Sequence, residues 1–142
     1  MKPPTIVHIF IAPKHGAAMQ SMERVEAMED AGLRGDRYTA RQVTFIELEN
    51  IEAFTQTTGL PLTPDKPRRN VVTRGIRLND LCGKRFRIGE ALFEGVELCE
   101  PCSLFARRTH REILDFFPQK AGLRARVISA GEIRVGESIE TL

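Results

Sequence analysis

The hydrophobic positions of this chain fall in short runs separated by turn residues, a pattern typical of strands. The run from Thr5 to Ala12 is rich in β-branched and apolar residues, which predicts a strand buried on both faces or nearly so. A weak alternation marks a further strand at 22–28, and clearer ones are expected at 42–48, 69–73, 84–88, 91–98, 123–129 and 138–142. The dipeptide Gly89-Glu90 joins two of these in the manner of a β-hairpin.

Two segments have helical spacing instead. The first is 47–58, with Ile51 and Phe54 on one face and Gly59 as its stop. The second is 103–117, which Ser103 is expected to cap and Pro118 to end, with an apolar stripe of Leu104, Ile113, Phe116 and Phe117. Many strands and about two helices predict a mainly-β fold. We expect a closed or partly closed β-barrel, because closure leaves no bare strand edges.

Composition and charge limit the possible partners. The 142 residues, 42% hydrophobic and 28% charged, indicate one globular domain spanning 1–142. A net charge of +2 is too small to suggest nucleic acid, and no apolar run reaches the length of a membrane helix, so we expect neither partner. Three cysteines, an odd number, favour a reducing compartment, and the start of the chain lacks a signal-peptide pattern. A cytoplasmic location is therefore expected.

Arg68, Arg69 and Asn70 form the first candidate binding motif. Two guanidinium groups and an amide suit an anion, most simply a phosphate. If the segment is a strand, Arg68 and Asn70 share one face while Arg69 points the other way. Asp36 and Arg37, which follow a glycine-containing turn, are candidates for the same pocket. The alternative is a solvated basic turn after a proline.

Cys102 is the candidate reactive residue. It precedes the second predicted helix, whose first amides, together with Arg107 and Arg108, favour a thiolate. The alternative is a buried core cysteine. Cys99 is either a second reactive thiol or structural, and Cys82 is expected to pack in a turn. These three cysteines and His110 lack the paired spacing of structural zinc sites.

Four blocks, taken in chain order, carry a family resemblance. They are IFIAP at 9–13; GLRGDRY at 32–38; RRNVV at 68–72 with LCGKRFRIG at 81–89; and EPC at 100–102, followed by GLRARV at 122–127 and GEI at 131–133. Together they resemble the MOSC domain, the molybdenum cofactor sulfurase C-terminal domain, in its short stand-alone form. One departure is Tyr38, which stands where the family often has histidine.

The resemblance implies a MOSC-type β-barrel that binds the pterin-based molybdenum cofactor or carries sulfur. By position, Cys102 corresponds to the cysteine that contacts molybdenum, and Arg68 and Asn70 to the residues that hold the cofactor. No lysine marks a pyridoxal phosphate site in this chain. The resemblance therefore implies a partner, either a pyridoxal phosphate-dependent cysteine desulfurase or an electron-transfer protein.

Three functions remain open at this stage. The first is a cofactor-binding or sulfur-carrier module that uses the Cys102 thiolate. The second is an enzyme, a molybdenum-dependent reductase of N-hydroxylated compounds with Cys102 as metal ligand. The third is an interaction domain without a ligand. The size of the chain favours the first, since a reductase must also accommodate a substrate and an electron donor.

Overall fold

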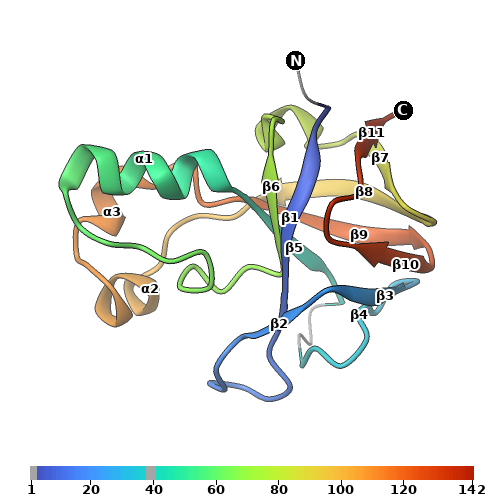
Figure 1. Ribbon diagram of the computed structural model, residues 1–142, viewed down its shortest axis with the longest axis horizontal. Helices are drawn as coiled ribbons and strands as arrows, with labels where there is room; N and C mark the ends of the chain where they lie inside the picture. Colours follow the sequence, from blue (N-terminus) through green and yellow to red (C-terminus); the bar gives the residue numbers. More distant parts are fainter. Residues whose placement is uncertain (1–2, 38–40) are drawn as a thin grey trace.

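A computed structural model describes residues 3–37 and 41–142, and within them the chain is mainly β with three α-helices. The helices gather at one end of the molecule and most of the strands at the other (Figure 1). The helices are α1 (Leu48–Thr58), α2 (Ser103–Arg108) and α3 (Ile113–Phe116), with a 3₁₀ turn at Leu78–Leu81. The strands are β1 (Thr5–Ile11), β2 (Gln20–Met22), β3 (Arg24–Met28), β4 (Gly32–Leu33), β5 (Val43–Glu47), β6 (Val71–Arg74), β7 (Arg85–Ile88), β8 (Ala91–Leu98), β9 (Leu123–Ser129), β10 (Gly131–Arg134) and β11 (Ile139–Thr141).

Eight strands form one mixed sheet in the order β11-β7-β8-β9-β5-β6-β1-β2, in which β5 and β6 are parallel. A second sheet has the order β10-β3-β4. The closed barrel expected from the sequence is not confirmed, because the large sheet ends at β11 on one side and at β2 on the other. β1 meets the segment before β11 at an isolated Thr5–Ser138 bridge, and the Ile6 amide donates to the Glu137 carbonyl at 3.0 Å.

The core lies on both faces of the central strands. One cluster sits on the strand-rich side, where the Phe45 ring meets Phe86 and Phe93 edge-on at centroid distances of 5.5 Å. The other lies beneath the helices and includes Phe54 and Phe117. β1, β5 and β6 contribute to both clusters. The prediction that the first strand is buried on both faces is thus confirmed, and these strands form a firm base for whatever their ends carry.

The helix predicted for 103–117 is wrong as a single element. The chain breaks between α2 and α3, where the Thr109 hydroxyl donates to the Phe105 carbonyl at 2.7 Å and His110 Nε2 lies 2.7 Å from the Pro61 carbonyl oxygen. The His110 ring also stacks on Phe54. These contacts hold the break against the segment after α1. The sequence pattern also missed β10, β4 and the 3₁₀ turn, whereas β8, β9 and the β7–β8 hairpin are confirmed.

Candidate functional site

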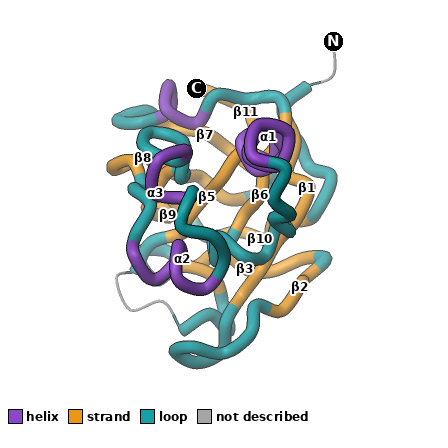
Figure 2. The backbone as a smooth tube through the Cα atoms, turned by 90° about the vertical axis from the view of Figure 1, so that its left-hand side faces the viewer, coloured by secondary structure: helices purple, strands orange, loops and turns teal. Residues whose placement is uncertain are grey.

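A pocket of about 180 Å³ lies where α2 meets the ends of the central strands, and all five sequence-predicted site residues line it. We call it the arginine recess. Figure 2 looks at this end of the molecule, with the three helices in front of the strands. The lining comes from the end of β1, the turn after β4, β5, the loop before β6, α2 and β9: Ala12, Met19, Asp36, Arg37, Thr44, Lys66, Pro67, Arg68, Arg69, Asn70, Cys102, Leu104, Phe105, Arg108 and Arg124.

Asn70 ties three strands together at the wall of the recess. Its Oδ1 accepts hydrogen bonds from the Thr44 amide at 3.1 Å and the Thr44 hydroxyl at 3.2 Å. Its Nδ2 donates to the Phe10 carbonyl at 3.1 Å, and its own amide donates to the Thr44 hydroxyl at 3.0 Å. The side chain is buried, with 4% of its surface exposed. These bonds fix β1 and β5 against the start of β6.

Arg68 does not belong to a strand, so the prediction that it shares a strand face with Asn70 is wrong. β6 begins at Val71, and Arg68 has the left-handed backbone conformation, with φ of 60°. Such a conformation is strained for a non-glycine residue and tends to occur at functional sites. The turn that produces it is closed by the Arg68 amide, which donates to the Asp65 carbonyl at 3.0 Å.

The guanidinium of Arg68 is poorly compensated. Its Nη2 is buried and has no hydrogen-bond partner among the described residues. Burial, then the nearby Arg108 and Arg37, lower the pKa of Arg68 from its ordinary value, while Asp36 opposes the shift. A buried donor without an acceptor is unfavourable. An anion in the recess would supply the acceptor and offset the repulsion.

The guanidinium group of Arg69, unlike Nη2 of Arg68, has a hydrogen-bond partner among the described residues. Its Nε donates to the Ala121 carbonyl at 2.9 Å. That carbonyl is positioned by Gly122, whose φ is 117° and whose absent Cβ would lie 1.9 Å from the Phe45 carbonyl oxygen. Only glycine permits this approach. Arg69 therefore connects the loop before β6 to the segment before β9, although it also lines the recess.

Asp36 and Arg37 line the recess and are tied to the end of β1. Asp36 Oδ1 accepts from the Ala12 amide at 2.8 Å, and the Arg37 amide donates to the Ala12 carbonyl at 2.9 Å. Arg37 Nε is buried without a hydrogen-bond partner among the described residues. Asp36 thus fixes the turn, and Arg37 carries a second unsatisfied donor. Tyr38, where the sequence departs from the family pattern, lies outside the described residues.

Cys102 is exposed, and it, rather than the predicted Ser103, is the N-cap of α2. Its Sγ accepts from the Phe105 amide at 3.4 Å. Cys99 is buried, with 2% of its surface exposed, and so belongs to the core. Cys82 is exposed, and its Sγ lies 3.5 Å from the Val96 carbonyl oxygen, outside the recess. Cys102 is therefore the cysteine that faces the arginines.

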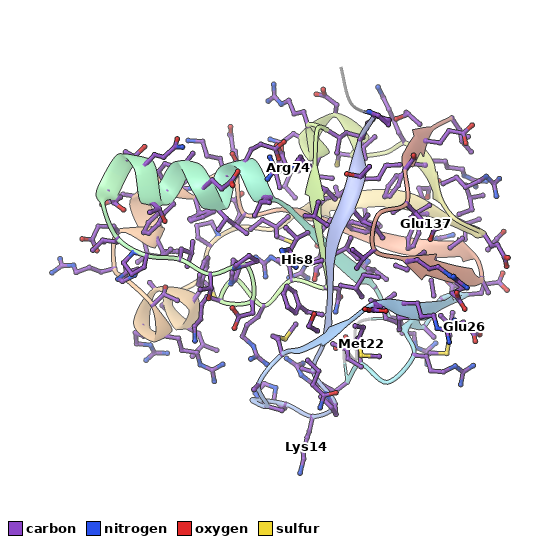
Figure 3. The ribbon with its side chains drawn as sticks, viewed as in Figure 1. His8, Lys14, Met22, Glu26, Arg74 and Glu137 are labelled. Atoms are coloured by element: carbon purple, nitrogen blue, oxygen red, sulfur yellow. The ribbon has the colours of Figure 1, made fainter. Side chains whose placement is uncertain are left out.

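The recess is strongly cationic. Six basic side chains line it, whereas Asp36 is the one carboxylate among the described lining residues. Sequence reasoning missed Lys66 and Arg124, and it considered Arg108 only as a nearby positive charge that favours the Cys102 thiolate. Lys66 immediately precedes the Pro67-Arg68-Arg69 motif, which was the available signal. Ala12 and Met19 border the loop after β1, and Lys14 projects away from the molecule at its tip (Figure 3).

A metal in this site would have few protein ligands. Over the described ranges there is no group of three or more His, Cys, Asp and Glu side chains that could hold a metal ion. Cys102 is the thiol lining the recess, so a metal there would have to bring most of its ligands with it. In the same part of the chain, no helix is long and apolar enough to cross a membrane.

Comparison with solved structures shows a known fold. The chain resembles the YuaD protein of Bacillus subtilis with a TM-score of 0.83 and 16% identity, over 97% of this chain and 95% of the other. It resembles YiiM of Geobacillus stearothermophilus with a TM-score of 0.80 and 22% identity, over 99% and 75% of the two chains. YiiM of Escherichia coli gives 0.72 and 19%, over 97% and 69%.

The sequence itself carries the family signature. A comparison with curated proteins finds no match. The family model for the MOSC domain, however, matches residues 15–140, which include every residue of the recess except Ala12. The resemblance inferred from the four sequence blocks is thereby confirmed. The chain belongs to the MOSC domain family.

Proposed function

We propose that this protein binds the molybdenum cofactor in the arginine recess and uses Cys102 either as a ligand to molybdenum or as a carrier of persulfide sulfur. The observation that carries this proposal is the buried Nη2 of Arg68, which has no hydrogen-bond partner in the described part of the chain and lies in a pocket that also exposes a thiol. An anion explains the first feature, and a soft metal or sulfur explains the second.

The residues present fit the phosphorylated end of such a cofactor. A phosphate offers acceptors to Arg68 and Arg37, whose buried nitrogens have none among the described residues. The recess, at about 180 Å³, is smaller than the roughly 300 Å³ of a typical ligand pocket. A hollow of about 320 Å³ adjoins it and shares Met19, Lys66, Arg68 and Arg108. The two together have room for a ring system attached to a phosphate.

Each residue then has a distinct task. Arg68, Arg37 and Arg108 bind the anionic group, because their side chains line the recess and crowd one another. Asn70 and Asp36 are positioning residues, because hydrogen bonds to the scaffold already occupy them. Cys102 presents its sulfur at the start of α2. The cofactor, when bound, supplies the redox or oxygen-transfer chemistry of molybdenum, and the protein supplies the anion site and one thiol.

The sulfur-carrier form of the proposal is chemically balanced. The Cys102 thiolate attacks the outer sulfur of a donor persulfide, forming a new S–S bond while the donor S–S bond breaks. The donor leaves as a thiolate, and no external oxidant is needed because the transferred sulfur keeps its oxidation state. A pyridoxal phosphate-dependent cysteine desulfurase is a suitable donor. All three cysteines are free, so we also propose a reducing, cytoplasmic location.

We place binding and carriage ahead of the reduction of N-hydroxylated compounds. The arginine recess has little space for a substrate beside a pterin, and an electron donor would also need access. The interaction-domain alternative leaves the buried nitrogens of Arg68 and Arg37 without acceptors within residues 3–37 and 41–142.

Elemental analysis tests the proposal. Protein purified from a molybdenum-replete host should carry molybdenum and phosphorus, and should release a fluorescent pterin after oxidation. Arg68→Ala should lose both. The matched control is Arg85→Ala, which removes an arginine that pairs with Glu94 at 3.2 Å on the strand side. Wild-type protein without pterin, even after incubation with extract that contains the cofactor, would contradict the proposal.

A further inference from the structure

The outer face of α2 carries exposed positive charge next to Cys102. Leu104, Arg107 and Arg108 have the i, i+3, i+4 spacing that places side chains on one helix face, and all three are exposed. The opposite face, with Phe105 and Ala106, is buried in the core. Arg111, also exposed, follows in the turn after the helix. We call Leu104, Arg107, Arg108 and Arg111 the α2 surface.

No ion pair with a described residue compensates the charges of the α2 surface. Arg107, Arg108 and Arg111 form no ion pair or hydrogen bond with any described residue. No acidic residue occurs from 101 to 111. The nearest acid before this stretch, Glu100, accepts a hydrogen bond from the Gln119 amide at 3.2 Å. Elsewhere among the described residues seven arginines pair with carboxylates, whereas this surface gathers three arginines without one.

We propose that the α2 surface is the docking site for an acidic protein surface that delivers to or receives from Cys102. This rests on the proposed function, which requires a second macromolecule to reach that thiol. Cys102 is exposed and caps the same helix, so a partner seated on these arginines is already at the sulfur. Complementary charge accelerates encounter and orients the partner.

Other anionic partners match the α2 surface less well. A membrane-bound helix needs a stripe of large apolar residues beside its basic ones, whereas Leu104 is the one large apolar side chain on this face. Single-stranded nucleic acid is usually held by exposed aromatic rings, and Phe105 is 7% exposed. An acidic protein surface needs neither feature.

The test uses the full chain with Cys82→Ser, which leaves Cys102 as the exposed thiol, since Cys99 is buried. Three peptides each carry a cysteine in a mixed disulfide with thionitrobenzoate, flanked by glutamates, serines or lysines. The Cys102 thiolate attacks the peptide sulfur, a new S–S bond forms, and thionitrobenzoate leaves as a coloured thiolate. At low salt the glutamate peptide should react about tenfold faster than the serine peptide, and the advantage should shrink as salt screens the charges.

Two charge variants locate the effect. Arg107→Glu with Arg111→Glu should reverse the preference, and the glutamine versions of both should remove it if the first pair disturbs folding. Arg24→Glu with Arg87→Glu is the matched control, because both arginines are exposed on strands far along the chain and neither belongs to an ion pair among the described residues. That control should keep the preference.

Failure here is distinguishable from failure of the proposed function. Arg107 and Arg111 do not line the recess, so cofactor loading should be unchanged in their variants. Equal rates for the three peptides in a protein that still loads cofactor would overturn the docking site alone. Stronger protection of Cys102 by phosphatidylserine vesicles or by an oligodeoxynucleotide than by the disulfide-free glutamate peptide would also overturn it.

Discussion

Most arginines on the strand side of the molecule pair with carboxylates among the described residues, with Arg24 and Arg87 as exceptions, whereas those around the recess and on α2 mostly do not. On the strand side Arg85 lies 3.2 Å from Glu94 and Arg134 lies 2.6 Å from Glu132. At the recess Arg68 and Arg37 keep buried nitrogens without acceptors among the described residues. Exposed pairs contribute little to stability, about 0–1 kcal/mol each. The difference teaches that the strand side balances most of its charges internally, whereas the recess leaves charges unbalanced, which is the basis for proposing an anion from outside.

The largest expected effect is at Cys102, the thiol that lines the recess together with arginines that form no ion pair with a described residue. Cys102→Ser should abolish loading with molybdenum or sulfur, because a hydroxyl is a poor ligand for a soft metal and cannot carry a persulfide. The fold should survive, since serine is a preferred helix N-cap. Elemental analysis and circular dichroism check both points. Cys82→Ser, at another exposed thiol that does not line the recess, should load like wild type.

The next largest effect distinguishes the adjacent residues Arg68 and Arg69. Arg68→Ala should weaken binding of a phosphorylated pterin by about tenfold or more, because a charge-assisted hydrogen bond contributes roughly 1.5–3 kcal/mol. Arg69→Ala should weaken it less and instead lower stability by about 1 kcal/mol, through loss of the bond to the Ala121 carbonyl. Titration calorimetry and urea unfolding separate the two. Equal losses of affinity at both positions would contradict the distinction between Arg69, which is hydrogen-bonded to the scaffold, and Arg68, whose Nη2 has no partner among the described residues.

Because the backbone and the surroundings of Arg68 are unfavourable, replacing this residue should increase the free energy of unfolding. Arg68→Gly relieves the left-handed backbone and the crowding by Arg108 and Arg37, so the free energy of unfolding should rise by about 1 kcal/mol. Affinity for phosphate should fall in the same protein. Arg85→Gly on the strand side should lose stability instead, because it breaks an ion pair between β7 and β8. A loss of stability at position 68 would contradict the assignment.

The smallest effect concerns Glu47, the N-cap residue of α1. Burial raises the pKa of Glu47 above 4.5, with Glu49 and Asp80 adding to the rise, while the Leu78 amide and Arg77 oppose it. A raised folded-state pKa means that this group stabilises below pH 4.5 and loses that contribution as pH rises through the folded value. Glu47→Gln should therefore narrow the stability difference between pH 4 and pH 7, by less than about 1 kcal/mol. Chemical unfolding at both pH values measures it.

Sequence patterns located the site better than its geometry. Residue types together with the family resemblance named Asp36, Arg37, Arg68, Asn70 and Cys102 as candidates, and the fold places them around one pocket. Strand alternation failed at Arg68 because a turn, closed by the Asp65 carbonyl, replaces the strand there. The role of Asn70 depends on Thr44 and Phe10, which lie 26 and 60 residues away and leave no local signal.

In the fold too, features set by neighbouring residues were predictable, whereas features set by contacts distant in sequence were not. Hairpin strands β7 and β8 were predictable because turn and strands are adjacent in sequence. The break after α2 depends on His110 meeting Pro61 and Phe54, which are distant in sequence, so apolar spacing continued the helix too far. Barrel closure likewise depends on how far the two edges of the sheet are brought together, and the large sheet ends at β11 and β2.

The sulfur atom of Cys102 has two roles in this structure. Cys102 Sγ is the exposed thiol of the recess, and it also accepts the Phe105 amide that begins α2. Any new bond to that sulfur changes the acceptor at the first turn of the helix whose outer face carries Leu104 and Arg107. We expect the helix to act as an indicator of occupancy, so that a visiting protein meets a differently ordered surface when the sulfur is loaded. A change in the chemical shift of the Phe105 amide, followed by NMR during loading, would report this change at the first turn of α2 directly.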